Sequence, residues 1–185
     1  TDAGDAAGPA ADPAVTQRVV ASSATALAGC EAAAARRYDH VVRHERRLDC
    51  PVGDAAGEIV ATLLRGPPGV YLWGGETTLQ LPEDPGRGGR CQQLALRCAL
   101  ELAGRPGLAV LCGATDGSDG PGEDAGGLVD GRTIARGEAE GLSGAACLAA
   151  ADAGRFLAAA GDLISTGPTG TNVNDLVVGL RADAG

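Results

Sequence analysis

The sequence predicts an α/β protein with a mainly parallel sheet and helices on both faces, a three-layer, Rossmann-like arrangement that includes one β-hairpin. Short apolar segments that suit strands alternate with longer helical segments, as in proteins of this class. One apolar segment, Leu108 to Cys112, has no polar residue, which is typical of a strand buried on both faces. A strand, a helix and a second strand in series favour right-handed crossovers and parallel strands.

The length of 185 residues suits one substantial core, so we expect a single α/β domain over residues 16–185. Residues 1–15 contain mostly Asp, Ala, Gly and Pro and have no periodicity, which predicts a disordered tail or linker remnant.

The first third of the chain predicts two strand and helix pairs. Residues 18–21 form a short apolar strand, and the serines at 22 and 23 cap an alanine-rich helix over about 24–37. A second strand is centred on Val41 and Val42. The helix over 54–65 has an apolar stripe and ends at Gly66-Pro67-Pro68.

The hairpin is predicted where the strand Val70 to Trp73 turns, through a double glycine, into the alternating segment Leu79 to Leu81. A long amphipathic helix follows the glycine-rich loop 86–90. The remaining elements are predicted as the strand at 108–112, two or three short helices within 128–160, a short strand at 162–164 and a last strand at 175–180.

Two arginines, Arg87 and Arg90, lie on that glycine-rich loop at the amino terminus of the amphipathic helix. Unpaired backbone N–H groups and the helix dipole favour an anion there, so the loop suits phosphate or carboxylate. The alternative is a plain turn whose arginines are solvated.

Two further loops carry polar groups. Asp116, Asp119 and Asp124 follow the strand at 108–112, at the edge of the sheet where α/β proteins bind ligands, and carboxylates suit Mg²⁺ carried with a nucleotide. The alternative is turn formation by Asp-Gly pairs alone. Glycines and hydroxyl groups between Ser165 and Asn172 could form an oxyanion cradle, although a Walker loop is excluded because its lysine is missing.

Composition excludes several classes of function. The formal net charge of -9 argues against nucleic-acid binding. Every basic side chain is Arg. The six cysteines have no metal-binding spacing and suit reduced thiols, no apolar run is long enough to span a membrane, and no secretory signal is recognisable. We therefore expect a cytoplasmic protein without a membrane partner.

Four motifs occur in the order seen in one known family. They are GGETT at 74–78 with GRGGR at 86–90, TDGSDGP at 115–121, DAGG at 124–127 and TGPTGTNVND at 166–175. Together they resemble the MOFRL C-terminal domain of the glycerate 2-kinase family, some of whose members are named hydroxypyruvate reductase. The resemblance covers a core of about residues 70–185.

The resemblance implies ATP-dependent phosphorylation of glycerate to 2-phosphoglycerate, with ATP and Mg²⁺ as cofactors. It assigns carboxylate or phosphate binding to Arg87 and Arg90, and the metal or nucleotide to Asp116 and Asp119. Two loops would complete the pocket, its floor formed by Gly75, Glu76, Thr77 and Thr78 and its opposite lip by Thr169, Gly170, Thr171 and Asn172.

The sequence also departs from the family. The larger N-terminal domain that completes the family's active-site cleft is not recognisable before Thr16. Cys91 stands where the family usually has Asn, and the segment Ala151-Asp152-Ala153-Gly154 stands where the family usually has an Asn-Asp-Ser run. Three hypotheses follow: a kinase subunit that needs a partner chain or a homo-oligomer, a catalytically silent ligand-binding or assembly module, or a hydroxypyruvate reductase-type oxidoreductase. The last lacks a G-x-G-x-x-G motif after a strand.

Overall fold

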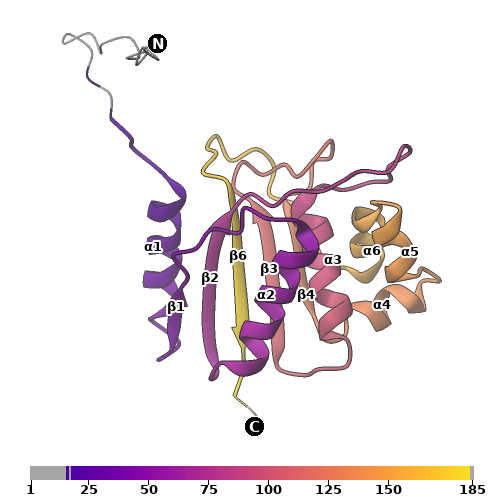
Figure 1. Ribbon diagram of the computed structural model, residues 1–185, viewed down its shortest axis with the longest axis horizontal. Coiled ribbons are helices and arrows are strands. Elements are labelled where there is room, and N and C mark those ends of the chain that lie inside the picture. Colours follow the sequence, from indigo (N-terminus) through magenta and orange to yellow (C-terminus); the bar gives the residue numbers. More distant parts are fainter. Residues whose placement is uncertain (1–15, 17, 184–185) are drawn as a thin grey trace, which may run out of the picture.

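The computed structural model describes residue 16 and residues 18–183, so the tail predicted at 1–15 lies outside the described residues. The described chain forms a six-stranded sheet with helices on both faces, which confirms the α/β class (Figure 1). The strand order is β1-β2-β6-β3-β4-β5. The strands are β1 (Val41–Arg43), β2 (Gly69–Gly75), β3 (Leu108–Ala114), β4 (Gly126–Asp130), β5 (Leu163–Ile164) and β6 (Asp175–Arg181).

The predicted mainly parallel sheet is wrong in its pairing. Only β1 and β2 pair in parallel, and the other four pairs are antiparallel. As predicted, β1, β2 and β3 run in the same direction, because α2 and α3 connect them in turn. However, β6 lies between β2 and β3 and runs against both, over the full lengths of the two strands.

The helices follow the predicted pattern closely. They are α1 (Ser23–Ala34), α2 (Val52–Arg65), α3 (Arg90–Leu102), α4 (Thr133–Ala139), α5 (Gly144–Ala149) and α6 (Ala153–Ala160). The Ser22 hydroxyl accepts a hydrogen bond from the Thr25 N–H, which caps α1. The region 128–160 holds three short helices as expected, but its first residues belong to β4.

Two predicted strands are absent from the structure. Residues 18–21 are not part of the sheet, and the side chains of Val19 and Val20 are 83% and 84% exposed. The segment Leu79 to Leu81 is a loop, and the preceding Thr78 makes an isolated bridge to Pro51. The predicted hairpin is therefore wrong; β3 and β4 pair as a hairpin instead, because the loop 115–125 turns back without a helix.

The main core lies between one face of the sheet and the helices α2, α3 and α6. Trp73 of β2, Ile59 of α2 and Phe156 of α6 are fully buried in it. A smaller cluster lies on the other face, where Leu27 of α1 packs on Val70 and Leu72 of β2. No helix within the described part of the chain is long and apolar enough to cross a membrane.

Candidate functional site

Loops from distant parts of the sequence meet above one edge of the sheet, at the top of Figure 1. The carboxyl ends of β2 and β3 lie at this edge, and the antiparallel β6 begins there. The loops 76–89 and 115–125 and the turn 165–174 are therefore brought together. The edge carries polar groups from all three.

Two cavities adjoin at this edge. The larger has a volume of about 670 Å³ and is lined by Arg47, Asp49, Glu76, Thr77, Thr78, Leu79, Leu81, Gly88, Gly89, Arg90, Asp119, Gly120 and Pro121. The smaller, of about 80 Å³, is lined by Glu76, Arg90, Ala114, Thr115, Asp116, Ser118, Asp119, Gly120, Asn172, Asn174 and Asp175. Four residues line both cavities and therefore stand at their junction: Glu76, Arg90, Asp119 and Gly120.

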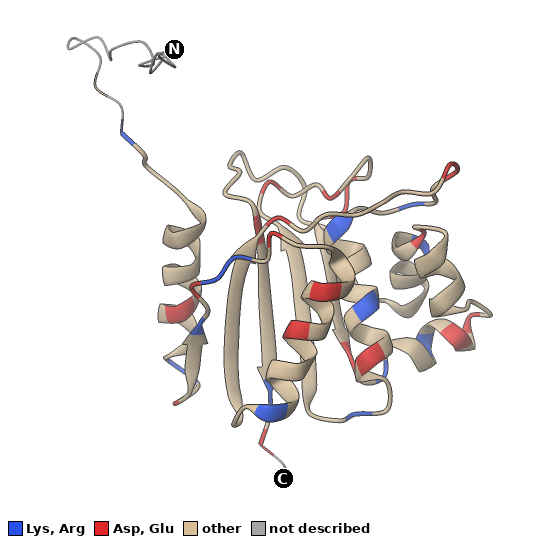
Figure 2. Ribbon diagram, in the orientation of Figure 1, with Lys and Arg blue, Asp and Glu red and all other residues tan. Residues whose placement is uncertain are grey.

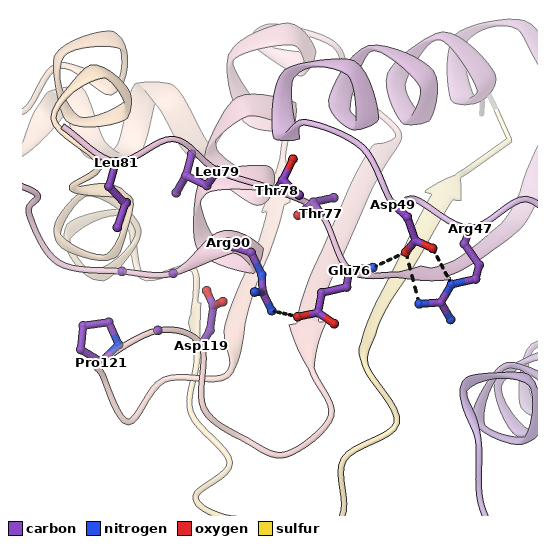
Figure 3. Close-up of a pocket in the computed structure, with 13 residues that line it drawn as sticks. Arg47, Asp49, Glu76, Thr77, Thr78, Leu79, Leu81, Arg90, Asp119 and Pro121 are labelled. Carbon is purple, nitrogen blue, oxygen red and sulfur yellow. Dashed lines mark hydrogen bonds and ion pairs between the residues drawn. The ribbon is translucent and has the colours of Figure 1, made fainter. Parts of the chain in front are cut away.

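Arg90 begins α3 and extends its guanidinium group between two carboxyl groups. Its Nη2 lies 2.9 Å from Glu76 Oε1 (Figure 3). The same nitrogen lies 3.9 Å from Asp175 Oδ2. The Asn174 amide donates to the other oxygen of Glu76 at 2.9 Å. Arg90 is thus held in one orientation beside the cavities, with its side chain 43% exposed.

A further ion pair supports the loop that carries Glu76. Arg47 Nε donates to Asp49 at 2.8 Å, and Asp49 accepts the Glu76 backbone N–H at 2.9 Å (Figure 3). The hydrogen bond from Arg47 lowers the pKa of Asp49. The segment after β1 is thereby fixed to the end of β2.

Asp119 occupies the anion position predicted at the start of α3. Its two carboxylate oxygens accept the backbone N–H groups of Cys91 at 3.0 Å and Gln92 at 2.8 Å. Gly89 allows this approach, because a Cβ there would come within 2.4 Å of Asp119. Burial raises the pKa of Asp119, while the hydrogen bonds from Gln92 and Cys91 oppose that rise. The helix amino terminus therefore binds a carboxylate of the protein itself.

Asp116 joins the acidic loop to the threonine-rich turn. Its Oδ2 accepts the Asn172 amide at 3.1 Å, and its backbone carbonyl accepts the Thr169 N–H at 3.0 Å. The close approach of Gly117 to Gly167 requires glycine, since a Cβ at Gly117 would lie 2.0 Å from the Gly167 carbonyl oxygen. The two loops form one continuous wall.

Of the other predicted site residues, some line the larger cavity and some line neither cavity. Thr77 and Thr78 line the larger cavity, and Gly75 ends β2 directly beneath it. Thr169, Gly170 and Thr171 are exposed on the turn and line neither cavity.

Arg87 also lines neither cavity. Its guanidinium group pairs with Asp124, which in turn accepts the Ser165 hydroxyl. The hydrogen bond from Ser165, and then that from Arg87, lower the pKa of Asp124. Arg87 fastens the loop 76–89 to β4 and β5, away from Arg90.

Asp175 is a site residue that the sequence analysis missed. Burial raises its pKa to about 6, against the opposing charge of Arg90 and a hydrogen bond from the Cys91 thiol. Cys91 is 2% exposed, burial raises the pKa of its thiol, and it lines neither cavity. The Cys91 thiol is therefore a buried neighbour of Asp175.

Asn174 and Asp175 were missed as site residues because the sheet was expected to be parallel, whereas Arg47 and Asp49 were missed although they follow a parallel strand. In a parallel sheet the start of the last strand lies at the far edge, whereas the antiparallel β6 begins beside Glu76. The segment after β1 was open to prediction, since loops at the carboxyl ends of parallel strands bind ligands.

Acidic groups outnumber basic groups at the smaller cavity. Its lining contains the carboxyl groups of Glu76, Asp116, Asp119 and Asp175, and one cation, Arg90. Figure 2 shows acidic segments gathered in the loops above this edge. An anionic ligand would therefore need cations beyond those at this cavity.

The residues described here do not form a metal site by themselves. Within residues 16 and 18–183 there is no group of three His, Cys, Asp or Glu side chains placed to hold one ion. Asp119 already accepts an N–H group on each oxygen, and Asp116 accepts one hydrogen bond on each.

Loops that surround a cavity at one edge of an α/β sheet are typical of α/β proteins that bind small molecules. The MOFRL family matches residues 69–175, more than half of the chain. The chain belongs to the MOFRL family.

Similar proteins include kinases that act on glycerate. The D-glycerate 2-kinase of Thermotoga maritima is 39% identical over 142 residues, which are 72% of this chain and 34% of the relative. A protein of Agrobacterium vitis that carries a hydroxypyruvate reductase name is 42% identical over 114 residues, 61% of this chain and 29% of the relative. The chain thus spans about a third of the length of these relatives.

Solved structures confirm the fold. The crystal structure of the Thermotoga maritima glycerate kinase superimposes with a TM-score of 0.81 at 33% identity, covering 87% of this chain and 41% of that one. A Pyrococcus horikoshii protein gives a TM-score of 0.83 at 30% identity, covering 92% and 41%.

Proposed function

We propose that this chain supplies one wall of a glycerate 2-kinase-type active site, which transfers the γ-phosphoryl group of ATP to glycerate and yields 2-phosphoglycerate. The observation that carries the proposal is the position of Arg90, held by Glu76 at the junction of two cavities in a member of the MOFRL family. A planar guanidinium group suits the carboxylate of glycerate or a phosphoryl oxygen.

The roles of the remaining residues follow from their places. Glu76 orients Arg90, and Asp49 fixes Glu76 through its backbone N–H. Thr77, Thr78, Leu79 and Leu81 line the larger cavity, whose volume of about 670 Å³ suits a ligand of nucleotide size. We propose that Mg²⁺ enters the site bound to the phosphates of the nucleotide. Asp116, whose carboxylate contacts Asn172 of the turn 165–174, would lie nearest to this ion.

Catalysis requires cations that this wall lacks. Phosphoryl transfer depends on neutralising charge on the phosphates, and the smaller cavity holds one Arg against four carboxyl groups. We therefore propose that the site is completed by a complementary region, meaning the part of the Thermotoga maritima kinase that this chain does not match, or its counterpart on a partner chain. Small-molecule substrates, glycerate and ATP, are the ligands.

The test is reconstitution. The chain is mixed with the complementary region of the Thermotoga maritima kinase, and 2-phosphoglycerate formation from ATP and glycerate is followed. Arg90→Gln should lower kcat/KM at least 100-fold, because it removes a charge aimed at the reacting groups. Arg97→Gln is the matched control, since Arg97 pairs with Glu101 and lines neither cavity. Equal activity of the two variants would contradict the assignment.

A catalytically silent binding module is the second candidate, favoured by the acidic excess at the smaller cavity. Calorimetry separates the two: a silent module binds glycerate or nucleotide but gives no turnover with the complementary region. The reductase hypothesis has the relatives' name in its support, and it requires NAD(P)H-dependent reduction of hydroxypyruvate, measured as loss of absorbance at the nicotinamide band.

A further inference from the structure

A further cavity, named here the Gln93 cavity, lies where the start of α2 and the loop 78–80 meet the helices α3 and α5. Figure 1 shows α2 and α3 side by side on one face of the sheet. The volume of the cavity is about 600 Å³. Thr78 and Leu79 also line the larger cavity of the candidate site, so the two cavities adjoin.

Gln93 of α3 lines this cavity with a side chain that is almost entirely buried. The residue is 1% exposed, and neither Nε2 nor Oε1 of its amide has a hydrogen-bond partner within the described part of the chain. The preceding Gln92, by contrast, donates its amide to the Asp119 carbonyl at 3.3 Å. Buried polar groups are nearly always paired. The Gln93 amide therefore indicates a partner that the described chain does not supply.

The start of α2 leaves room on the solvent side of the cavity. The Val52 N–H donates to the Thr78 carbonyl at 3.0 Å, whereas the Gly53 N–H has no partner among residues 16 and 18–183. Gly53 lines the cavity, and a Cβ added to it would meet no atom within 4 Å. The cavity is thus open at Gly53 and closed by Gln93.

The charges around the cavity favour a neutral ligand. Of the described residues that line it, only Arg97 is charged, and its guanidinium group pairs with Glu101 at 3.6 Å. Asp54 lies in the first turn of α2, where its carboxylate opposes a second anion at the helix amino terminus. An anion therefore gains little from this site.

The chemistry of the lining suits the edge of a flat ring. A primary amide offers a donor and an acceptor in one plane, the pair that binds the amino group and a ring nitrogen of adenine. Val52, Leu79 and Leu148 line the same cavity and provide apolar contact for the ring. The volume of about 600 Å³ lies within the range of small-molecule sites.

We propose that the Gln93 cavity binds an adenine-type base, whose amino group donates to Oε1 of Gln93 and whose ring nitrogen accepts from Nε2. The base has two possible sources. One is the ATP of the proposed function, with its phosphates extending past Thr78 into the larger cavity. The other is a free nucleoside or nucleotide. Only the first source rests on the proposed function.

The first test uses the wild-type chain and two nucleosides. Calorimetry should give a Kd for adenosine below about 1 mM. Purine riboside lacks the 6-amino group and should bind at least tenfold more weakly, because Oε1 of Gln93 then stays unpaired. Absence of adenosine binding, or equal affinity for the two nucleosides, would overturn the proposal.

Variants of the chain locate the site. Gln93→Leu should weaken adenosine binding at least tenfold, because leucine offers neither a donor nor an acceptor. Gly53→Leu fills the open side of the cavity and should weaken binding as much. It should not lower the melting temperature, because leucine favours a helix more than glycine does.

Two matched controls should bind adenosine as the wild type does. Gly29→Leu makes the same change in α1, where an added Cβ also meets nothing within 4 Å and the residue does not line the cavity. Arg97→Gln changes a side chain that takes no part in the proposed contact. If Gln93→Leu does not fold, Gly53→Leu decides, and unchanged adenosine affinity in that variant would overturn the proposal.

Kinetics of the reconstituted kinase identify the source of the base. A KM for ATP that rises at least tenfold in Gln93→Leu, with the KM for glycerate unchanged, identifies the base as that of ATP. An unchanged KM for ATP, together with adenosine binding that requires Gln93, identifies a separate nucleoside site. Both results support the proposal.

The inference and the proposed function fail separately. Adenosine binding that requires Gln93, in a chain that gives no kinase activity with the complementary region, would contradict the function and leave the base site standing. An active kinase whose chain does not bind adenosine would do the reverse.

Discussion

Ala151 has a φ of 51°, a left-handed backbone conformation that a residue with a Cβ rarely adopts. Asn tolerates this conformation better than Ala does. The neighbouring Asp152 accepts the Arg87 N–H at 2.8 Å, so the turn holds the loop 76–89 in place. Ala151 is thus a source of strain next to the residue that anchors this loop.

We expect Ala151→Gly to raise the free energy of unfolding by about 0.5–1 kcal/mol, because relief of left-handed strain exceeds the entropy that glycine adds to the unfolded chain. Ala153→Gly, in the buried first turn of α6, should lower it by about 1 kcal/mol. Urea denaturation measures both. If both variants lower the free energy of unfolding, the backbone of Ala151 is not strained.

Asp175 makes stability depend on pH. Its pKa is about 6 in the folded protein and about 3.9 in an unfolded chain, so the folded state holds the proton more tightly. The favourable contribution of this proton is complete below pH 4 and is lost as the pH rises through about 6.

Asp175→Asn should therefore gain stability relative to the wild type between pH 4 and pH 7, by on the order of 1–3 kcal/mol. Guanidinium denaturation at several pH values measures the difference. The exposed Glu83→Gln serves as control, and a difference between Asp175→Asn and wild type that does not change with pH would contradict the raised pKa.

At the scale of elements, α3 connects the core to the site. Its buried face includes Leu94, Ala95 and Cys98, while its first N–H groups bind Asp119 from a loop 27 and 28 residues away. Gly89 precedes the helix and offers no side chain as a cap. The helix and the loop 115–125 therefore stabilise each other.

Asp119→Ala should lower the free energy of unfolding by roughly 2–3 kcal/mol, since it leaves two buried N–H groups without a partner. Asp116→Ala, which removes partly exposed hydrogen bonds, should cost less than about 1 kcal/mol. Denaturation and amide exchange of residues 91 and 92 would report the change. Unaltered exchange at these two amides in Asp119→Ala would show that the carboxylate is not their acceptor.

At the scale of the whole molecule, the elements could be predicted better than their pairing. Hydrophobic periodicity is a local property, so it located α2, α3 and the strands β2, β3 and β6 to within a few residues. Pairing depends on which strand lies between which others. The sequence near Asp175 does not say that β6 separates β2 from β3, and the predicted parallel sheet followed from chain order alone.

In the candidate site, too, local features could be predicted from the sequence and long-range contacts could not. Glycine-rich and acidic loops were recognised from their composition, and the structure brings Arg90, Asp116, Asp119 and Asn172 to one cavity. The sequence could not show that Asp119 fills the helix terminus or that Arg87 turns away to Asp124, because both depend on contacts across more than 25 residues. Asp175 was hidden by the assumed direction of its strand.

The central position of β6 bears on how the protein is made. While residues 175–181 are still within the ribosomal exit tunnel, β2 and β3 each lack the neighbour between them, and the nascent chain exposes two unpaired backbone edges. The two halves of the sheet can join only when this strand emerges. Synthesis stalled just before Asp175 would leave a product with both edges open to strands of other molecules, and such a product would need chaperone binding or degradation to stay out of aggregates.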